Sequence, residues 1–215
     1  MTAAGLSIAY VPLILFTVST CGTPGPNNMM VMASGVNYGF RRSLPHVIGI
    51  NTGFPLMVVA VGLGLGGVLR NFPVLYDILR PIGAAYLLYL AYRTATASPV
   101  TPGDAADARP QRRPLSLVQA ALFQLVNPKS WVMIVGALVT YATATGDYLL
   151  QVFVIALIFL VFGTPCTSGW LWIGMSLKRV LTRPLHFRVF NVGMACLLVI
   201  SLVPILEEIY RTFVH

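Results

Sequence analysis

The stretch Cys21-Gly22-Thr23-Pro24-Gly25-Pro26-Asn27-Asn28 interrupts a long apolar run near the start of the chain. Proline has no N–H and clashes with the carbonyl four residues earlier, so Pro24 and Pro26 should release the carbonyls of Thr20 and Gly22. The neighbouring glycines make unwinding easier. We therefore expect a helix that breaks inside an apolar segment, where the freed carbonyls need protein or water as partners.

The composition sets the environment in which this break must be stable. Apolar residues make up 57% of the 215 residues and charged residues only 9%, whereas soluble domains carry roughly a quarter charged residues. These values exclude a soluble domain, and three widely spaced cysteines exclude a disulfide framework. Because the apolar runs lack the period-two alternation of a membrane barrel, the chain is predicted to be an all-α integral membrane protein.

Six apolar stretches are long enough to cross a bilayer core, which takes about 20 residues per helix. They cover residues 6–36, 46–69, 74–92, 117–141, 148–177 and 187–206. The fourth contains a second break, Gln124-Leu125-Val126-Asn127-Pro128-Lys129-Ser130, where Pro128 should free the carbonyl of Gln124. We expect six transmembrane helices, of which the first and the fourth are broken.

The loops indicate the orientation in the membrane. Ten of the fourteen Lys and Arg residues follow the first, third and fifth spans, so those loops are predicted to be cytoplasmic. Both termini then face the extracytoplasmic side of the membrane. The basic residues are spread over loops rather than gathered on one face, so no nucleic acid partner is expected despite the net charge of +8.

The two halves of the chain carry matching motifs. Gly53-Phe54-Pro55 is matched by Gly163-Thr164-Pro165, 110 positions later. Gly83-Ala84-Ala85-Tyr86-Leu87-Leu88 is matched by Gly193-Met194-Ala195-Cys196-Leu197-Leu198 at the same offset. Three spans is an odd number, so a second copy would enter the membrane with opposite polarity. This pattern is typical of the inverted repeats of many secondary transporters.

The repeat sets the expected domain organisation. A first three-helix repeat covers residues 1–93, and a second covers residues 116–215. The segment between them, 94–115, is rich in Ala, Thr, Pro and Asp. We expect it to be a flexible cytoplasmic linker.

Pairs of glycines four residues apart recur in the first half of the chain. They are Gly35 and Gly39, Gly49 and Gly53, and Gly62 and Gly66. Such spacing lets helices approach closely. The contacts could lie within one subunit, which is the simpler expectation, or in a homodimer.

Lys129 is the only formally charged residue deep within a predicted span. At about 1.5 Å per residue it lies roughly 18 Å along a helix that starts at Leu117, near the middle of the bilayer core. A charge at that depth costs roughly 2.5–3.5 kcal/mol, so it needs a partner or a use. Two interpretations stay open: a lysine that only caps freed carbonyls, and a lysine that binds a substrate.

Two facing breaks would suit a small zwitterion. A half-helix N-terminus presents free N–H groups, which together with Lys129 favour a carboxylate. Freed carbonyls and side-chain amides can accept hydrogen bonds from an ammonium group, although the Asn27-Asn28 pair can also serve as helix caps. The residues expected to bind substrate are Pro24, Gly25, Pro26, Asn27, Asn28, Gln124, Asn127, Pro128, Lys129 and Trp131.

Four motifs occur together over nearly the whole chain: Thr23-Pro24-Gly25-Pro26-Asn27-Asn28, Gly49-x-x-x-Gly53, Gly83-Ala84-Ala85-Tyr86-Leu87 and Asn127-Pro128-Lys129. Their combination resembles the LysE/RhtB family of amino-acid exporters. The resemblance implies a six-helix inner-membrane carrier that moves amino acids or their derivatives outward, as an antiporter with protons. It also implies that the proline, glycine, asparagine and lysine residues of the two breaks fall on the motif positions of the family.

The chain departs from many members of that family at Phe54, where they have an acidic residue that would be the obvious proton carrier. No Asp or Glu lies deep in any predicted span. Proton coupling would therefore be absent or would use another ionisable group. The candidates are Lys129, His46, Asp77 and Asp147.

Three features resemble one branch of the family in particular. They are Phe54, the pair Asn27-Asn28 and the stretch Tyr38-Gly39-Phe40-Arg41-Arg42-Ser43. Together they look most like the branch that exports cysteine and O-acetylserine. This resemblance implies small neutral amino acids as substrates.

Other classes of function have little support in the sequence. The chain has no Gly-x-Ser-x-Gly, His-Glu-x-x-His or phosphate-loop motif, so we expect neither enzyme activity nor a cofactor. The three histidines lie far apart, at predicted span ends or at the terminus, so no metal site is expected. A membrane scaffold or regulatory protein that transports nothing is the alternative to a carrier.

Overall fold

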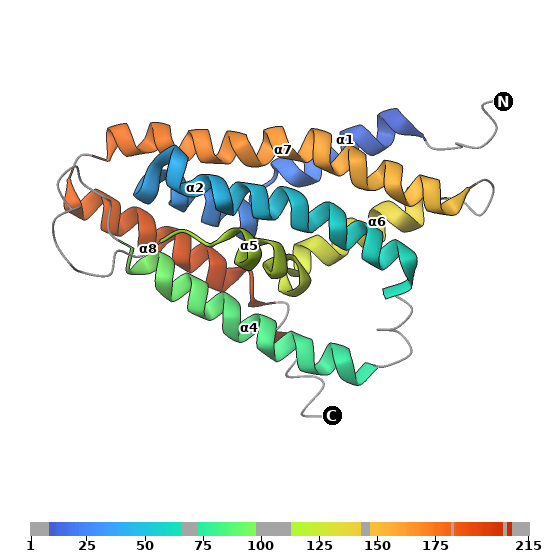
Figure 1. The fold of residues 1–215 in the computed structure, drawn as a ribbon. Helices are drawn as coiled ribbons and strands as arrows, with labels where there is room; N and C mark the ends of the chain where they lie inside the picture. Colours follow the sequence, from blue (N-terminus) through green and yellow to red (C-terminus); the bar gives the residue numbers. More distant parts are fainter. Residues whose placement is uncertain are drawn as a thin grey trace.

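The computed structural model of the chain describes residues 9–65, 73–97, 113–142, 147–181, 183–203 and 206–207. Every regular element in these ranges is helical, which confirms the all-α prediction. The elements are α1 (Tyr10–Gly22), α2 (Pro26–Ala60), the π-helix η2 (Val61–Leu65), α4 (Pro73–Ala95), α5 (Leu117–Phe123), the 3-10 helix η3 (Gln124–Val126), α6 (Pro128–Tyr141), α7 (Tyr148–Val180) and α8 (Pro184–Ile200) (Figure 1).

Both predicted breaks interrupt helices where the prolines lie. The first separates α1 from α2, which begins at Pro26. The second separates α5 and η3 from α6, which begins at Pro128. Proline is tolerated at the first position of a helix, because the N–H that it lacks would have no partner within the helix there. The prolines therefore define where each second half-helix starts.

Gly39 folds α2 back on itself. Its φ of 74° and ψ of −175° favour glycine over residues with a side chain. Ser34 before the bend and His46 after it lie side by side, with Ser34 Oγ 3.0 Å from His46 Nδ1. Residues 26–38 and 40–60 therefore form two packed arms. The sequence predicted a loop between two spans here, whereas the structure reverses the chain at one glycine.

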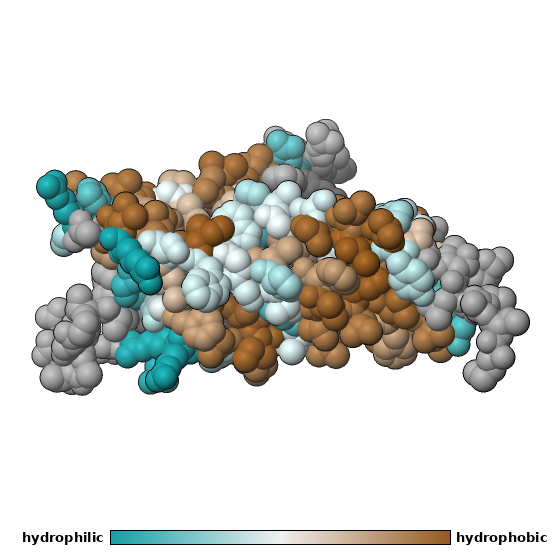
Figure 2. Space-filling model, turned by 90° about the horizontal axis from the view of Figure 1, so that it is seen from above, coloured by the Kyte–Doolittle hydropathy of each residue, from teal (hydrophilic) through white to brown (hydrophobic). Residues whose placement is uncertain are grey.

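The long helices are apolar enough for a membrane. By length and composition, Pro26–Gly64 and α7 can each cross one. Leu117–Val126 and Pro128–Tyr141, bent by 69°, make a third span if they are counted together, and α1 and α8 are shorter apolar helices. Hydrophobic surface covers much of the face seen in Figure 2. The chain is thus an apolar, all-helical membrane protein, and its division into six spans stays a prediction.

Two apolar cores hold the helices together. One joins α2, α4, α5, α7 and α8 and includes Leu87 and Phe123. The other joins α1, α2, α6 and α7 and includes Leu13 and Ile155. Because α2 and α7 contribute to both cores, they join the segments that contain the two breaks into one packed body.

Four of the paired glycines, Gly35, Gly49, Gly53 and Gly62, make close contacts within the chain, whereas a Cβ on Gly39 would have no atom within 4 Å. A Cβ on Gly35 of α2 would lie 2.6 Å from the carbonyl oxygen of Leu171 in α7. A Cβ on Gly53 would lie 2.5 Å from Cα of Ala121 in α5. Such distances leave room only for glycine, so these positions act in packing inside one subunit. Gly66 lies outside the described residues, and a homodimer stays a prediction.

Basic residues gather at one end of the molecule. Figure 1 places the bend of α2, the ends of α4 and α7 and the start of α8 at the same end. Arg41-Arg42, Arg93, Lys178-Arg179 and Arg183 occupy these positions, and Figure 2 shows hydrophilic surface there. Asp147 begins α7 at the opposite end. Of the loop residues used for the predicted orientation, Arg70, Arg109 and Arg112 lie outside the described residues.

Candidate functional site

Side chains from neighbouring segments satisfy the carbonyls that the first break releases. Trp170 Nε1 of α7 donates to the carbonyl oxygen of Gly22 at 3.1 Å. Thr23 Oγ1 donates to the carbonyl oxygen of Thr20 at 2.9 Å. These are the two carbonyls that the proline spacing predicted to be free. The break is stable because protein donors replace the missing helical hydrogen bonds.

Asn28 stabilises the same break from the α2 side. Its Nδ2 donates to the carbonyl oxygens of Cys21 and Thr23, at 2.7 and 2.8 Å. The N-cap of α2 is Gly25, which has extended backbone and no side chain to accept from the first N–H groups. The predicted capping role of Asn28 is therefore exercised at the end of α1, while the start of α2 has no side-chain cap.

At the second break, a side chain caps the helix that follows. Asn127 is the N-cap of α6, and its Oδ1 accepts from the backbone N–H of Lys129 at 3.2 Å. The backbone N–H of Ser130 donates to the carbonyl oxygen of Asn127 at 3.0 Å. The start of α6 is thus satisfied internally. Of the two half-helix N-termini, only that of α2 lacks a side-chain cap.

Lys129 reaches from the second break to the first. Its Nζ donates to Thr23 at both the carbonyl oxygen and Oγ1, each at 2.8 Å, and to the carbonyl oxygen of Pro24 at 3.3 Å. The stem of the lysine passes over Gly25, where a Cβ would lie 2.7 Å from Lys129 Cδ. Lys129 therefore bonds to two carbonyls of the first break, those of Thr23 and Pro24, which are not the two that the proline spacing predicted to be free.

A pair of amides joins the two breaks. Asn27 Nδ2 donates to Gln124 Oε1 at 2.9 Å, and Gln124 Nε2 donates back to Asn27 Oδ1 at 3.3 Å. Gln124 is fully buried, and its Oε1 also accepts from Ser130 Oγ at 3.0 Å. Because each amide satisfies the other, the pair fixes the position of one half-helix relative to the other.

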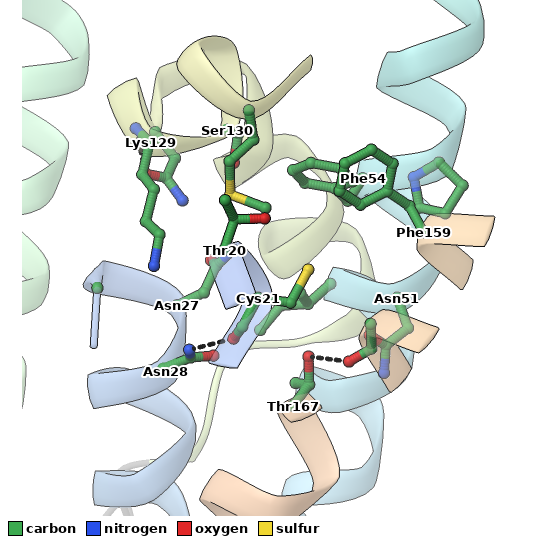
Figure 3. Close-up of a pocket in the computed structure, with 16 residues that line it drawn as sticks. Thr20, Cys21, Asn27, Asn28, Asn51, Phe54, Lys129, Ser130, Phe159 and Thr167 are labelled. Atoms are coloured by element: carbon green, nitrogen blue, oxygen red, sulfur yellow. Dashed lines mark hydrogen bonds between the residues drawn. The ribbon is translucent and has the colours of Figure 1, made fainter. Parts of the chain in front are cut away.

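A cavity of about 500 Å³, including its open mouth, lies between the breaks. Figure 3 shows Lys129 on one side of the cavity and Phe54 with Phe159 on the other. The two aromatic rings are 4.9 Å apart at an angle of 50°. The cavity thus combines a polar wall built by the breaks with an aromatic wall from α2 and α7.

Half of the predicted binding residues line this cavity. They are Gly25, Asn27, Asn28, Asn127 and Lys129. Gln124 and Pro24 lie behind this wall, bonded to Asn27 and Lys129 respectively. Pro26 and Pro128 start the half-helices. Trp131 is held away from the lining by a 2.8 Å hydrogen bond from its Nε1 to the carbonyl oxygen of Leu125.

The sequence did not predict the rest of the lining. The additional residues are Thr20, Cys21, Ile50, Asn51, Phe54, Pro55, Ser130, Met133, Phe159, Gly163 and Thr167. Asn51 offered a signal, because it is an amide within an otherwise apolar span. Within the described residues its side chain makes no hydrogen bond, so it is available to a ligand. Cys21 also lines the cavity.

His46 lies elsewhere and corrects an expectation. The sequence placed it at a helix mouth as an interfacial residue, but only 1% of it is exposed. The bend at Gly39 folds the second arm of α2 onto the first, which covers the imidazole. Its Nδ1 lies 3.0 Å from Ser34 Oγ, and His46 does not line the cavity between the breaks.

Comparison with known proteins identifies similar sequences. A family model described as LysE type translocator matches residues 18–202. The cysteine/O-acetylserine efflux proteins of Salmonella paratyphi A, Salmonella typhi and Escherichia coli K12 are each 29% identical to the chain over 185 residues. Those matches cover 86% of this chain and 90% of each relative. No solved structure matches.

Proposed function

The chain belongs to the LysE type translocator family, and we propose that it exports small neutral amino acids or their derivatives across the inner membrane. Membership agrees with the resemblance seen in the sequence and makes the chain a translocator rather than an enzyme. Cysteine and O-acetylserine are the substrates we favour, because the similar efflux proteins carry these names. The observation that carries the proposal is the cavity between the two breaks.

The polar wall suits the carboxylate of an amino acid. The start of α2 has no side-chain cap, and the N–H groups of a first helical turn favour an anion. Lys129 lines the same cavity and brings a positive charge. An ammonium group has three N–H donors, and those of Lys129 contact Thr23 and Pro24. A carboxylate that binds Lys129 would therefore displace at least one of these contacts.

That displacement would create a place for the amino group of the substrate. Once Lys129 turns toward the carboxylate, a carbonyl of Thr23 or Pro24 can accept from the substrate ammonium. The amide oxygen of Asn51 offers a further acceptor on the opposite arm of α2. In this exchange the zwitterion replaces hydrogen bonds that the two breaks make with each other in its absence. Substrate binding would thus loosen one contact between the half-helices.

The aromatic wall favours a neutral substrate. Phe54 and Phe159 form an apolar surface, and no Asp or Glu is among the described residues that line the cavity. A cationic side chain would have no counter-ion there, whereas a short apolar or thiol side chain would lie against the rings. This composition favours cysteine-like compounds over lysine or arginine.

We propose that the six predicted spans form two inverted three-helix repeats, over 1–93 and 116–215. Two contacts support this arrangement. Gly53 of α2 packs on Ala121 of α5, and its counterpart Gly163 of α7 packs on α1, where a Cβ would lie 3.3 Å from Cys21 Sγ. In each case the glycine of one repeat contacts the first half-helix of the other. Reciprocal packing of this kind is what a pseudo-two-fold axis would produce.

The gathering of basic residues supports the proposed orientation. Arg41-Arg42, Arg93 and Lys178-Arg179 lie at one end of the molecule (Figures 1 and 2), and basic residues are enriched on the cytoplasmic side. Residues 94–115 would then link the repeats on the cytoplasmic side, and both termini would be extracytoplasmic.

We propose that proton entry drives export. Lys129 is a titratable group that contacts both breaks and the cavity, which makes it the best placed carrier. Asp147 caps α7, and the side chain of Asp77 lies outside the described part of the chain. In proteoliposomes, an ionophore that collapses the pH gradient should abolish uphill efflux. Uphill efflux that continues without the gradient would exclude proton coupling.

The decisive test of transport is reconstitution. Purified protein in liposomes loaded with labelled cysteine, O-acetylserine, threonine, homoserine, leucine or lysine should release the small neutral compounds in a saturable way. The non-transporting alternative is favoured by one observation, since Lys129 caps carbonyls as a purely structural lysine would. If no compound leaves the liposomes under any gradient, the scaffold or regulatory function is correct.

A further inference from the structure

A second cavity, of about 390 Å³ including its open mouth, lies at the basic end of the molecule. The two arms of α2, the end of α4 and the segment before α5 line it, and its polar lining includes Ser34, Asn37, His46, Arg93 and Arg113. None of the residues that line it also lines the cavity between the breaks. The second cavity is therefore a separate feature.

His46 contributes a buried polar atom that lacks a partner. Its Nε2 is buried and makes no hydrogen bond within the described residues. The Ser34 hydroxyl can donate to Nδ1, 3.0 Å away, and the neutral imidazole then carries its proton on Nε2. A buried donor without an acceptor is unfavourable. His46 lines the cavity, so a bound acceptor atom that reached Nε2 would remove this cost.

Two guanidinium groups give the cavity a positive charge. Arg93 Nη2 donates to the carbonyl oxygen of Arg113 at 2.6 Å, and the Arg93 guanidinium lies 5.8 Å from the centre of the Tyr89 ring. These contacts hold the group but use only part of its five N–H donors. No Asp or Glu is among the described residues of the lining. The charge is thus available to an anion, and a planar guanidinium matches a carboxylate.

Asn37 of the lining belongs to a second amide pair. Asn37 Nδ2 donates to Asn191 Oδ1 at 2.8 Å, and Asn191 Nδ2 donates back to Asn37 Oδ1 at 3.0 Å. Asn191 also donates to the carbonyl oxygen of Ala97 at 2.9 Å. Both amides are satisfied within the chain.

We propose that this second cavity is a loading site that binds the carboxylate of the amino acid before it reaches the cavity between the breaks. The proposal rests on the proposed export function and on the basic end being cytoplasmic. Asn37 of the second cavity and Asn28 of the first lie nine residues apart on one arm of α2, which is about 14 Å of helix. Met30, which lines the second cavity, and Ile50, which lines the first, belong with Val47 to one buried apolar core that joins the two cavities. A substrate would bind at the basic end, cross this barrier and bind again at Lys129.

The test compares transport with substrate offered from either face of the membrane. In proteoliposomes of known orientation, Arg113→Gln and His46→Gln should each raise the half-saturating concentration at the basic face by about tenfold. The maximal rate from the basic face should change less than twofold. Arg179→Gln is the matched control, because Arg179 is an exposed arginine at the same end that does not line the cavity.

The outcomes separate this proposal from the export proposal. If the wild-type protein transports but Arg113→Gln leaves half-saturation at the basic face unchanged, the loading site is wrong and export stands. If the wild-type protein transports nothing, export fails. Arg113 is exposed, so its variant keeps the test valid even if the buried His46→Gln variant does not fold.

Two further experiments identify the anion that the second cavity binds. Cysteamine, which lacks the carboxylate of cysteine, should compete with cysteine at the basic face equally poorly in wild type and in Arg113→Gln. The same variants are then measured in phosphatidylcholine vesicles with and without phosphatidylglycerol. An effect of Arg113→Gln that disappears without the anionic lipid would overturn the proposal, because the arginine would then bind a lipid phosphate.

Discussion

Lys129 of α6 donates a 2.8 Å hydrogen bond to the carbonyl oxygen of Thr23, which lies in the break between α1 and α2. The cation of one break is thus bound by the freed backbone of the other. A buried charge and buried carbonyls without hydrogen-bond partners are each unfavourable in an apolar body. Here the ammonium group and the carbonyls satisfy each other, which explains why the chain can contain both. It also means that a ligand for either group must disturb the contact between the breaks.

Replacement of Lys129 tests whether that contact serves transport. Lys129→Met keeps the apolar stem and removes the charge, so we expect efflux of cysteine to fall at least tenfold, because the substrate carboxylate loses a charge-assisted partner. The measurement is initial efflux from proteoliposomes at matched protein content. Lys178→Met, in the last turn of α7, is the control and should leave the rate unchanged.

Folding must be measured on the same Lys129 variant. Removal of the ammonium leaves the carbonyls of Thr23 and Pro24 without this donor, which should destabilise the protein by about 1–3 kcal/mol. Thermal unfolding in detergent reports that loss. A variant that is destabilised but transports at the wild-type rate would show that the lysine is purely structural.

The amide pair of Asn27 and Gln124 should behave as one energetic unit. We expect a double-mutant cycle of Asn27→Ala and Gln124→Ala to give a coupling energy of about 0.5–3 kcal/mol, because either single change already leaves the other amide without its partner. Unfolding of the purified protein in detergent is the measurement. Thr164→Ala combined with Gln124→Ala is the control and should be additive, since Thr164 bonds to Leu160 within α7. Additivity for Asn27 and Gln124 would mean that the pair does not hold the breaks together.

Local chemistry explains which parts of the site the sequence could predict. The positions of both breaks follow from proline, which acts on its own helix, and Lys129 was identifiable because a charge in an apolar run is rare. Asn127 caps α6 directly before Pro128, although capping was expected only of the Asn27-Asn28 pair. These signals need no knowledge of the tertiary structure.

Contacts between distant segments explain what the sequence missed. Phe159 lines the cavity only because α7 packs against α2, and nothing in the apolar run around it distinguishes it from its neighbours. His46 was misplaced because its burial depends on the positive φ of Gly39, which folds the two arms of α2 together. The reciprocal partners Asn27 and Gln124 were each identified, but their pairing across 97 positions could not be derived from either segment alone.

Close packing at Gly53 should be intolerant of a methyl group. We expect Gly53→Ala to destabilise the protein by about 1–3 kcal/mol, because the new Cβ would meet the backbone of Ala121. Gly169→Ala is the matched control in α7, where no atom lies within 4 Å of the would-be Cβ. It should be neutral or stabilise the helix by about 0.5–1 kcal/mol. The measurement is thermal unfolding of both variants. Equal stabilities of the two variants would contradict the tight contact between α2 and α5.

The proposed orientation predicts which residues face each side. Arg179→Cys, in the last turn of α7, should react with a membrane-impermeant maleimide only from the cytoplasmic side, and Asp147→Cys only from the other side. The parent protein, with Cys21, Cys166 and Cys196, gives the background labelling. The reverse pattern would place the basic end outside and would also remove the basis for a cytoplasmic loading site.

Phe54 should set the charge of the substrate. Its ring lines the cavity beside Phe159, and no described lining residue is acidic, so a cationic side chain has no counter-ion. Phe54→Glu places a carboxylate there and should raise the ratio of lysine to cysteine efflux at least tenfold, because it attracts a cation and leaves an unpaired charge against neutral substrates. Phe54→Leu, which stays apolar, should keep the wild-type preference. If both variants change the two rates in parallel, the ring shapes the cavity without selecting charge, and the preference for neutral amino acids must arise from the polar wall at Lys129.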